Sequence, residues 1–133
     1  MSRRQDGMLL AVLIGVSVLW WIPQGTGPID LRSDGAIYYI LGTSLAQGQG
    51  YRLLNEPGSI HAVQYPPLLP LIVAAHQKAL ATSDVVVVGR YLRAFYFCVS
   101  VALMAAGYRL ARHFLSPGRA FLAGIVCALA LHM

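Results

Sequence analysis

The residues that could do chemistry are few, and most of them lie in one polar stretch, residues 24–90. The chain of 133 residues has five acidic side chains, none of them inside an apolar segment. No two of its four histidines are three or four residues apart, so the spacing of metal ligands is missing. Cys98 and Cys127 both lie in apolar runs, as small buried side chains do. A catalytic or binding site is therefore expected in the polar stretch.

Two short helices are predicted to position the residues of this stretch. Ser33 or Asp34 is a natural N-cap for a helix over residues 35–47, and two glycines then stop that helix. The Tyr65-Pro66-Pro67 corner fixes an extended backbone, from which a second helix runs over residues 67–82. Both helices are apolar but too short to span a bilayer, so they are predicted to lie at the membrane interface.

The composition predicts a membrane protein. The chain is 57% hydrophobic and 11% charged, whereas an average soluble domain is about 25% charged. Both a disordered tail and an ordinary soluble domain are disfavoured by these values. The fold class predicted is an all-α membrane protein with about three transmembrane helices, at residues 8–23, 91–111 and 120–133. The last span stops at the end of the sequence, so we expect the chain to be the N-terminal part of a longer protein.

Basic residues predict the orientation. Arg3 and Arg4 precede the first span, and Arg109, Arg112 and Arg119 follow the second. The positive-inside rule places both groups in the cytoplasm, with the N-terminus cytoplasmic and residues 24–90 as one outer loop. No aromatic residues alternate with these arginines, so no nucleic-acid partner is predicted.

Taken in order along the chain, these features resemble a known family. A basic start and one span are followed by SDGAIYYILGTSLAQGQGY, by QYPPLLPLIVAA and by a basic cytoplasmic corner. This order is similar to the N-terminus of GT-C superfamily integral-membrane glycosyltransferases, in the protein-mannosyltransferase-like and aminoarabinose-transferase-like branch. The resemblance implies transfer of a sugar from a polyprenyl-phosphate carrier to an unidentified acceptor at the outer face of a bacterial inner membrane.

The resemblance also implies roles for individual residues. Asp34 matches the family's catalytic acid, which takes the acceptor's proton or holds a divalent metal cation. Family members often have two adjacent acids here, and Ser33 stands in place of the first. Tyr38 and Tyr65 are predicted to bind substrate.

Structural roles explain the same residues without the family. Asp34 can simply cap a helix, Tyr38 can be an interfacial tyrosine and Tyr65 can belong to a rigid scaffold. For the whole chain, the alternative is a small non-enzymatic membrane subunit, or a fragment of a transporter or flippase.

Overall fold

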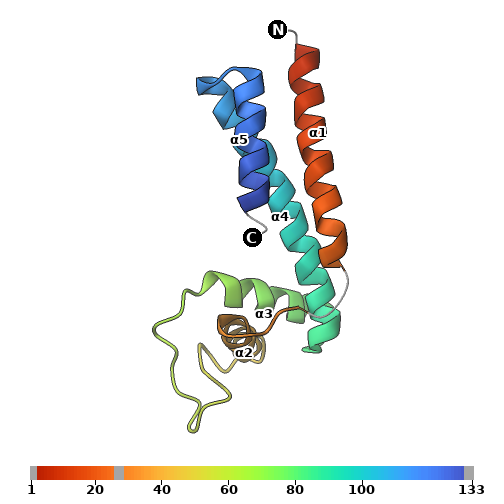
Figure 1. The fold of residues 1–133 in the computed structure, drawn as a ribbon. Helices are drawn as coiled ribbons and strands as arrows, with labels where there is room; N and C mark the ends of the chain where they lie inside the picture. The colour runs from red at the N-terminus through yellow and green to blue at the C-terminus, as the bar shows by residue number, and fades with distance from the viewer. Residues whose placement is uncertain (1–2, 26–28, 131–133) are drawn as a thin grey trace. The chain divides into compact units, whose positions relative to one another are not determined.

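Helices make up the regular structure of the protein. The computed structural model describes residues 3–25 and 29–130. The helices in these ranges are α1 Arg3–Trp21, the short 3₁₀ helix η1 Ile22–Gly25, α2 Asp34–Ala46, α3 Leu68–Leu80, α4 Val85–Phe114 and α5 Pro117–Ala130 (Figure 1). No β-strand occurs in the described ranges. The predicted all-α class is confirmed.

Helix α4 is the one helix of the described residues that is long and apolar enough to cross a membrane. Its 30 residues extend for about 45 Å, more than the roughly 30 Å of a hydrocarbon core. Only 17% of its apolar window is buried inside the structure, whereas the core helix of a soluble protein is mostly buried. The structure does not support the other two predicted spans, because α1 begins with a polar turn and α5 has only 14 residues.

Helix α4 begins at Val85, ahead of the start predicted at residue 91. Asp84 explains the early start, because its Oδ1 accepts hydrogen bonds from the backbone N–H groups of Val86 at 2.8 Å and Val87 at 2.9 Å. This is the geometry of an N-cap, which satisfies N–H groups that have no partner in the first turn of a helix. The polar stretch between the first two long helices therefore ends at Asp84.

The chain divides into two compact units. We call residues 1–26 and 95–133 the terminal unit, and residues 27–94 the central unit. In the terminal unit, α1 packs along α5 (Figure 1). Leu13 of α1 is fully buried against Gly124 of α5, where a Cβ in place of the glycine hydrogen would come within 2.7 Å of the leucine side chain.

In the central unit, α3 crosses over α2 and packs against it (Figure 1). Gly42 of α2 permits the close approach, since a Cβ at this position would lie 2.6 Å from Cβ of Val73 on α3. The buried residues of α2 are Tyr39, Leu41, Gly42 and Ser44. The absence of a side chain at Gly42 therefore lets the two helices come close together at Val73.

Candidate functional site

Asp34 is the first residue of α2, and its side chain is exposed. Within residues 3–25 and 29–130, no hydrogen bond or ion pair engages its carboxylate. A negative charge in the first turn is stabilised by the helix dipole. Ser33 occupies the N-cap position but makes no hydrogen bond with its side chain, so neither predicted capping residue acts as a side-chain cap among the described residues. The carboxylate is thus free to accept a proton or a ligand.

A compact turn before α2 fixes the position of Asp34. The Asp30 carboxylate accepts a hydrogen bond from the backbone N–H of Arg32 at 2.9 Å and forms an ion pair with its guanidinium at 3.0 Å. The hydrogen bonds from the Arg32 side chain hold the pKa of Asp30 below its usual value. Next along the chain, Ser33 has φ 52°, a conformation that is uncommon for a residue other than glycine.

Gly35 completes this turn. Its N–H donates a hydrogen bond to the carbonyl oxygen of Arg32 at 3.2 Å. A Cβ at Gly35 would lie only 2.7 Å from the carbonyl oxygen of Asp30, so the turn closes this tightly only around a glycine. The Ser-Asp-Gly sequence therefore presents the carboxylate from a constrained backbone.

Tyrosines gather on the same side of the central unit as Asp34. Tyr38 follows Asp34 by four residues, so the two side chains lie on one face of α2. The ring of Tyr38 meets the ring of Tyr65 edge to face, with the ring centres 6.0 Å apart. The structure thus brings together the two tyrosines predicted to bind substrate, next to the predicted acid.

Tyr51 holds this arrangement in place, a role that the sequence did not reveal. Its hydroxyl donates hydrogen bonds to the carbonyl oxygens of Tyr65 at 3.0 Å and Pro66 at 3.2 Å. Burial raises the pKa of the Tyr51 phenol, and nearby Tyr38 raises it further. The Gly-x-Gly-Tyr turn and the Tyr-Pro-Pro corner, which are distant in sequence, therefore meet. We call Asp34, Tyr38, Tyr51 and Tyr65 the tyrosine–aspartate cluster.

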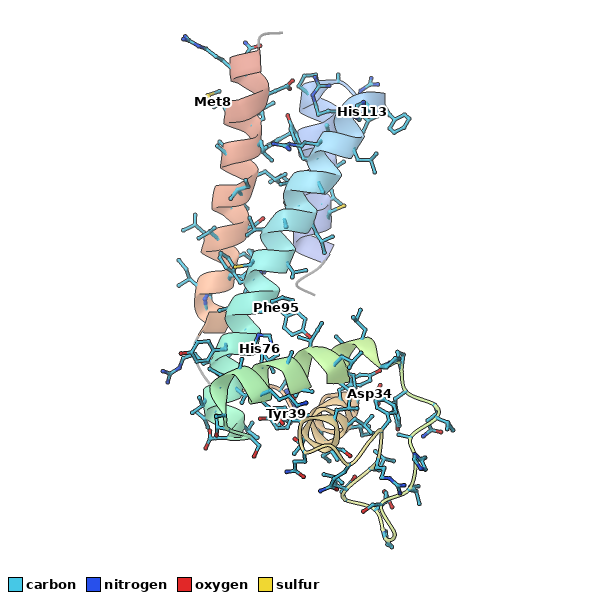
Figure 2. All side chains as sticks on the ribbon, turned by 180° about the vertical axis from the view of Figure 1, so that it is seen from behind. Met8, Asp34, Tyr39, His76, Phe95 and His113 are labelled. Carbon is cyan, nitrogen blue, oxygen red and sulfur yellow. The ribbon has the colours of Figure 1, made fainter. Side chains whose placement is uncertain are left out.

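Other residues of α2 have structural roles. Asp34 and Tyr39 are carried by α2 and His76 by α3 (Figure 2). Tyr39 is buried and donates from its hydroxyl to the carbonyl oxygen of Ser83 at 3.0 Å. Gln77 of α3 donates to Oγ1 of Thr43 at 2.9 Å. These bonds fix α2 in the central unit.

A divalent cation requires several oxygen ligands in one place. Among the residues that the structure describes, no three His, Cys, Asp or Glu side chains gather to supply them. Asp34 by itself does not supply the ligands of a metal site. The metal-binding role of Asp34 stays a prediction.

Comparison with protein-family models, with curated proteins and with solved structures finds no match to this chain.

Proposed function

We propose that the chain is part of an integral-membrane glycosyltransferase that moves a sugar from a polyprenyl-phosphate carrier to an acceptor at the outer membrane face. One observation carries the proposal: the exposed carboxylate of Asp34 lies one helical turn from Tyr38, whose ring contacts Tyr65. Aromatic rings pack well against the C–H faces of sugars, and a free carboxylate beside them can act on a sugar-bound or acceptor hydroxyl.

The chemistry is an inverting displacement. The oxygen of the acceptor hydroxyl attacks the anomeric carbon of the sugar, and the bond from that carbon to the phosphate oxygen breaks. The polyprenyl phosphate leaves with the bonding electron pair. Asp34 accepts the proton of the acceptor hydroxyl as the new glycosidic bond forms, which is general-base catalysis. Tyr38 and Tyr65 orient the sugar, and Tyr51 holds Tyr65 in position through its backbone.

Asp34→Asn tests this mechanism, because it keeps the size of the side chain and removes the proton acceptor. Loss of a general base lowers a rate by about 10²–10⁴-fold. Asp34→Glu keeps the charge but moves the carboxylate by one methylene group, and a displacement near 1 Å costs up to about 10²-fold. The measurement is transfer of labelled sugar from a polyprenyl-phosphate donor in membranes, normalised to inserted protein.

Glu56→Gln is the matched control, since Glu56 is an exposed acid in the same unit whose side chain forms no bond to the described residues. Asp30→Asn is less suitable, because Asp30 pairs with Arg32 and shapes the turn before α2. Near-normal transfer by Asp34→Asn would contradict the proposal and favour a non-enzymatic membrane subunit or a piece of a transporter.

The proposal includes the three-span topology, with spans at residues 8–23, 91–111 and 120–133 and with residues 24–90 outside. A single cysteine at Asn55 should react with an impermeant thiol reagent in intact cells, while one at Ser116 should not. Both positions are exposed in the structure. The native Cys98 and Cys127 are also exposed, so the prediction that they are small buried side chains is wrong, and they are replaced first. Labelling at Ser116, or protection at Asn55, contradicts this topology.

A further inference from the structure

A cavity of about 430 Å³ lies in the terminal unit, between the first turns of α1 and the last turns of α4. Asp6 and Leu10 of α1 line it, together with Tyr108, Arg109, Arg112 and His113 of α4. His113 lies at the C-terminal end of α4 (Figure 2). The proposed sugar transfer uses none of these residues.

An ion pair forms one wall of the cavity. Nε of Arg112 donates to Oδ1 of Asp6 at 2.9 Å, and Nη2 donates to Oδ2 at 3.0 Å. Nη1 of Arg112 donates to the carbonyl oxygen of Leu115 at 2.7 Å, and the Tyr108 hydroxyl donates to Asp6 at 3.4 Å. The charges of Asp6 and Arg112 therefore cancel, and this bidentate pair sets the shape of the wall.

Arg109 adds a positive charge to the lining that no acidic residue of the described chain neutralises. Arg109 and His113 are four residues apart on α4, both exposed, so their side chains lie on one face. Neither side chain forms a hydrogen bond or an ion pair with another described residue. The guanidinium of Arg109 has a planar set of donors that matches the oxygens of a phosphate.

We propose that this cavity binds the phosphate group of an anionic phospholipid. Arg109 and His113 would bind the phosphate, and the acyl chain would leave along the apolar wall that Leu10 and the Tyr108 ring provide. A lipid headgroup and free phosphate both present a phosphate group that Arg109 could bind. The apolar wall favours the lipid, because inorganic phosphate has nothing to place against it.

Native mass spectrometry of the protein in a neutral detergent tests the proposal, with phosphatidylglycerol as the probe. We expect one saturable lipid, with weaker binding of phosphatidylcholine. Arg109→Gln should weaken phosphatidylglycerol binding by about 10- to 100-fold, the effect of one lost hydrogen bond to a charged group. Arg109→Lys keeps the charge and should retain most of the affinity, which separates binding from folding. Arg119→Gln is the control, since Arg119 is also exposed and basic but lies outside the cavity.

Three results would overturn the proposal. Absence of saturable phosphatidylglycerol binding by the unmodified protein removes the site. Equal losses from Arg109→Gln and Arg119→Gln reduce the effect to general electrostatic attraction. Displacement of bound phosphatidylglycerol by inorganic phosphate at comparable concentration assigns the site to free phosphate and removes the lipid.

Discussion

The turn before α2 gives a prediction that leaves Asp34 itself unchanged. Gly35→Ala adds one methyl group, which would lie 2.7 Å from the carbonyl oxygen of Asp30, whereas ordinary contacts begin at 3.4 Å. The backbone must therefore move by about 0.7 Å. Asp30 and Gly35 are both hydrogen-bonded to the backbone of Arg32. The N–H of Arg32 donates to the Asp30 carboxylate, and the N–H of Gly35 donates to the carbonyl oxygen of Arg32. The turn has to open, and Asp34, the adjacent residue, moves with it.

A displacement near 1 Å of a catalytic group costs up to about 10²-fold in rate. We therefore expect Gly35→Ala to lower sugar transfer by roughly 10- to 100-fold, at normal levels of inserted protein. Gly107→Ala is the matched control, because nothing lies within 4 Å of a Cβ at this helical position. Wild-type transfer by Gly35→Ala, together with loss of transfer in Asp34→Asn, would refute the argument that this turn positions the carboxylate.

Three further predictions concern stability. Gly42→Ala should destabilise the contact between α2 and α3, because overpacking costs about 1–3 kcal/mol against a gain near 1 kcal/mol in helix propensity. Hydrogen exchange of the α2 and α3 amides should become faster, while Gly15→Ala, which adds its Cβ to open space, should not accelerate exchange in α1. Asp84→Ala removes the cap of α4 and should cost about 0.5–2 kcal/mol, seen as faster exchange confined to the first turn of α4. The third prediction concerns the ion pair of Asp6, because the hydrogen bond from Arg112 lowers the pKa of Asp6 from its ordinary value of 3.8. Because the folded state favours the ionised form of Asp6, the ion pair contributes fully to the free energy of unfolding above pH 3.8. This contribution to stability is lost as the pH falls through the pKa of Asp6 in the folded state. The difference in thermal midpoint between the wild type and Asp6→Asn should therefore be largest near neutral pH and vanish in acid.

Local signals were sufficient to locate the two short helices of the central unit. Helix α2 ends where Gly48 adopts φ 73°, and α3 begins directly after Pro67. Glycine in the left-handed region and proline ahead of a first turn act within a few residues, so their effects can be inferred from the sequence. The start of α4 was missed, although Asp84 supplies a capping side chain, because hydropathy alone places the start where the longest apolar run begins.

Contacts between distant segments could not be inferred in the same way. The hydroxyl of Tyr51 reaches the backbone of Tyr65, and that of Tyr39 reaches Ser83. A tyrosine in a loop has many possible partners, and only the packing of α2 against α3 selects among them. The sequence therefore predicted Tyr38 and Tyr65 as separate candidates, without the residue that connects their surroundings.

Arg112 shows why a charge pattern underdetermines function. The positive-inside rule counts Arg109, Arg112 and Arg119 alike, and acidic residues contribute little to it. In the structure Arg112 is bound by Asp6, whereas Arg109 opens onto a cavity and Arg119 lies outside it. Three residues that the rule counts alike thus have three different surroundings, and of the three only Arg109 combines an available guanidinium with an adjacent apolar wall. The proposed lipid site and the proposed sugar-transfer site also draw on different units of the chain, so Arg109→Gln and Asp34→Asn can be tested independently of each other.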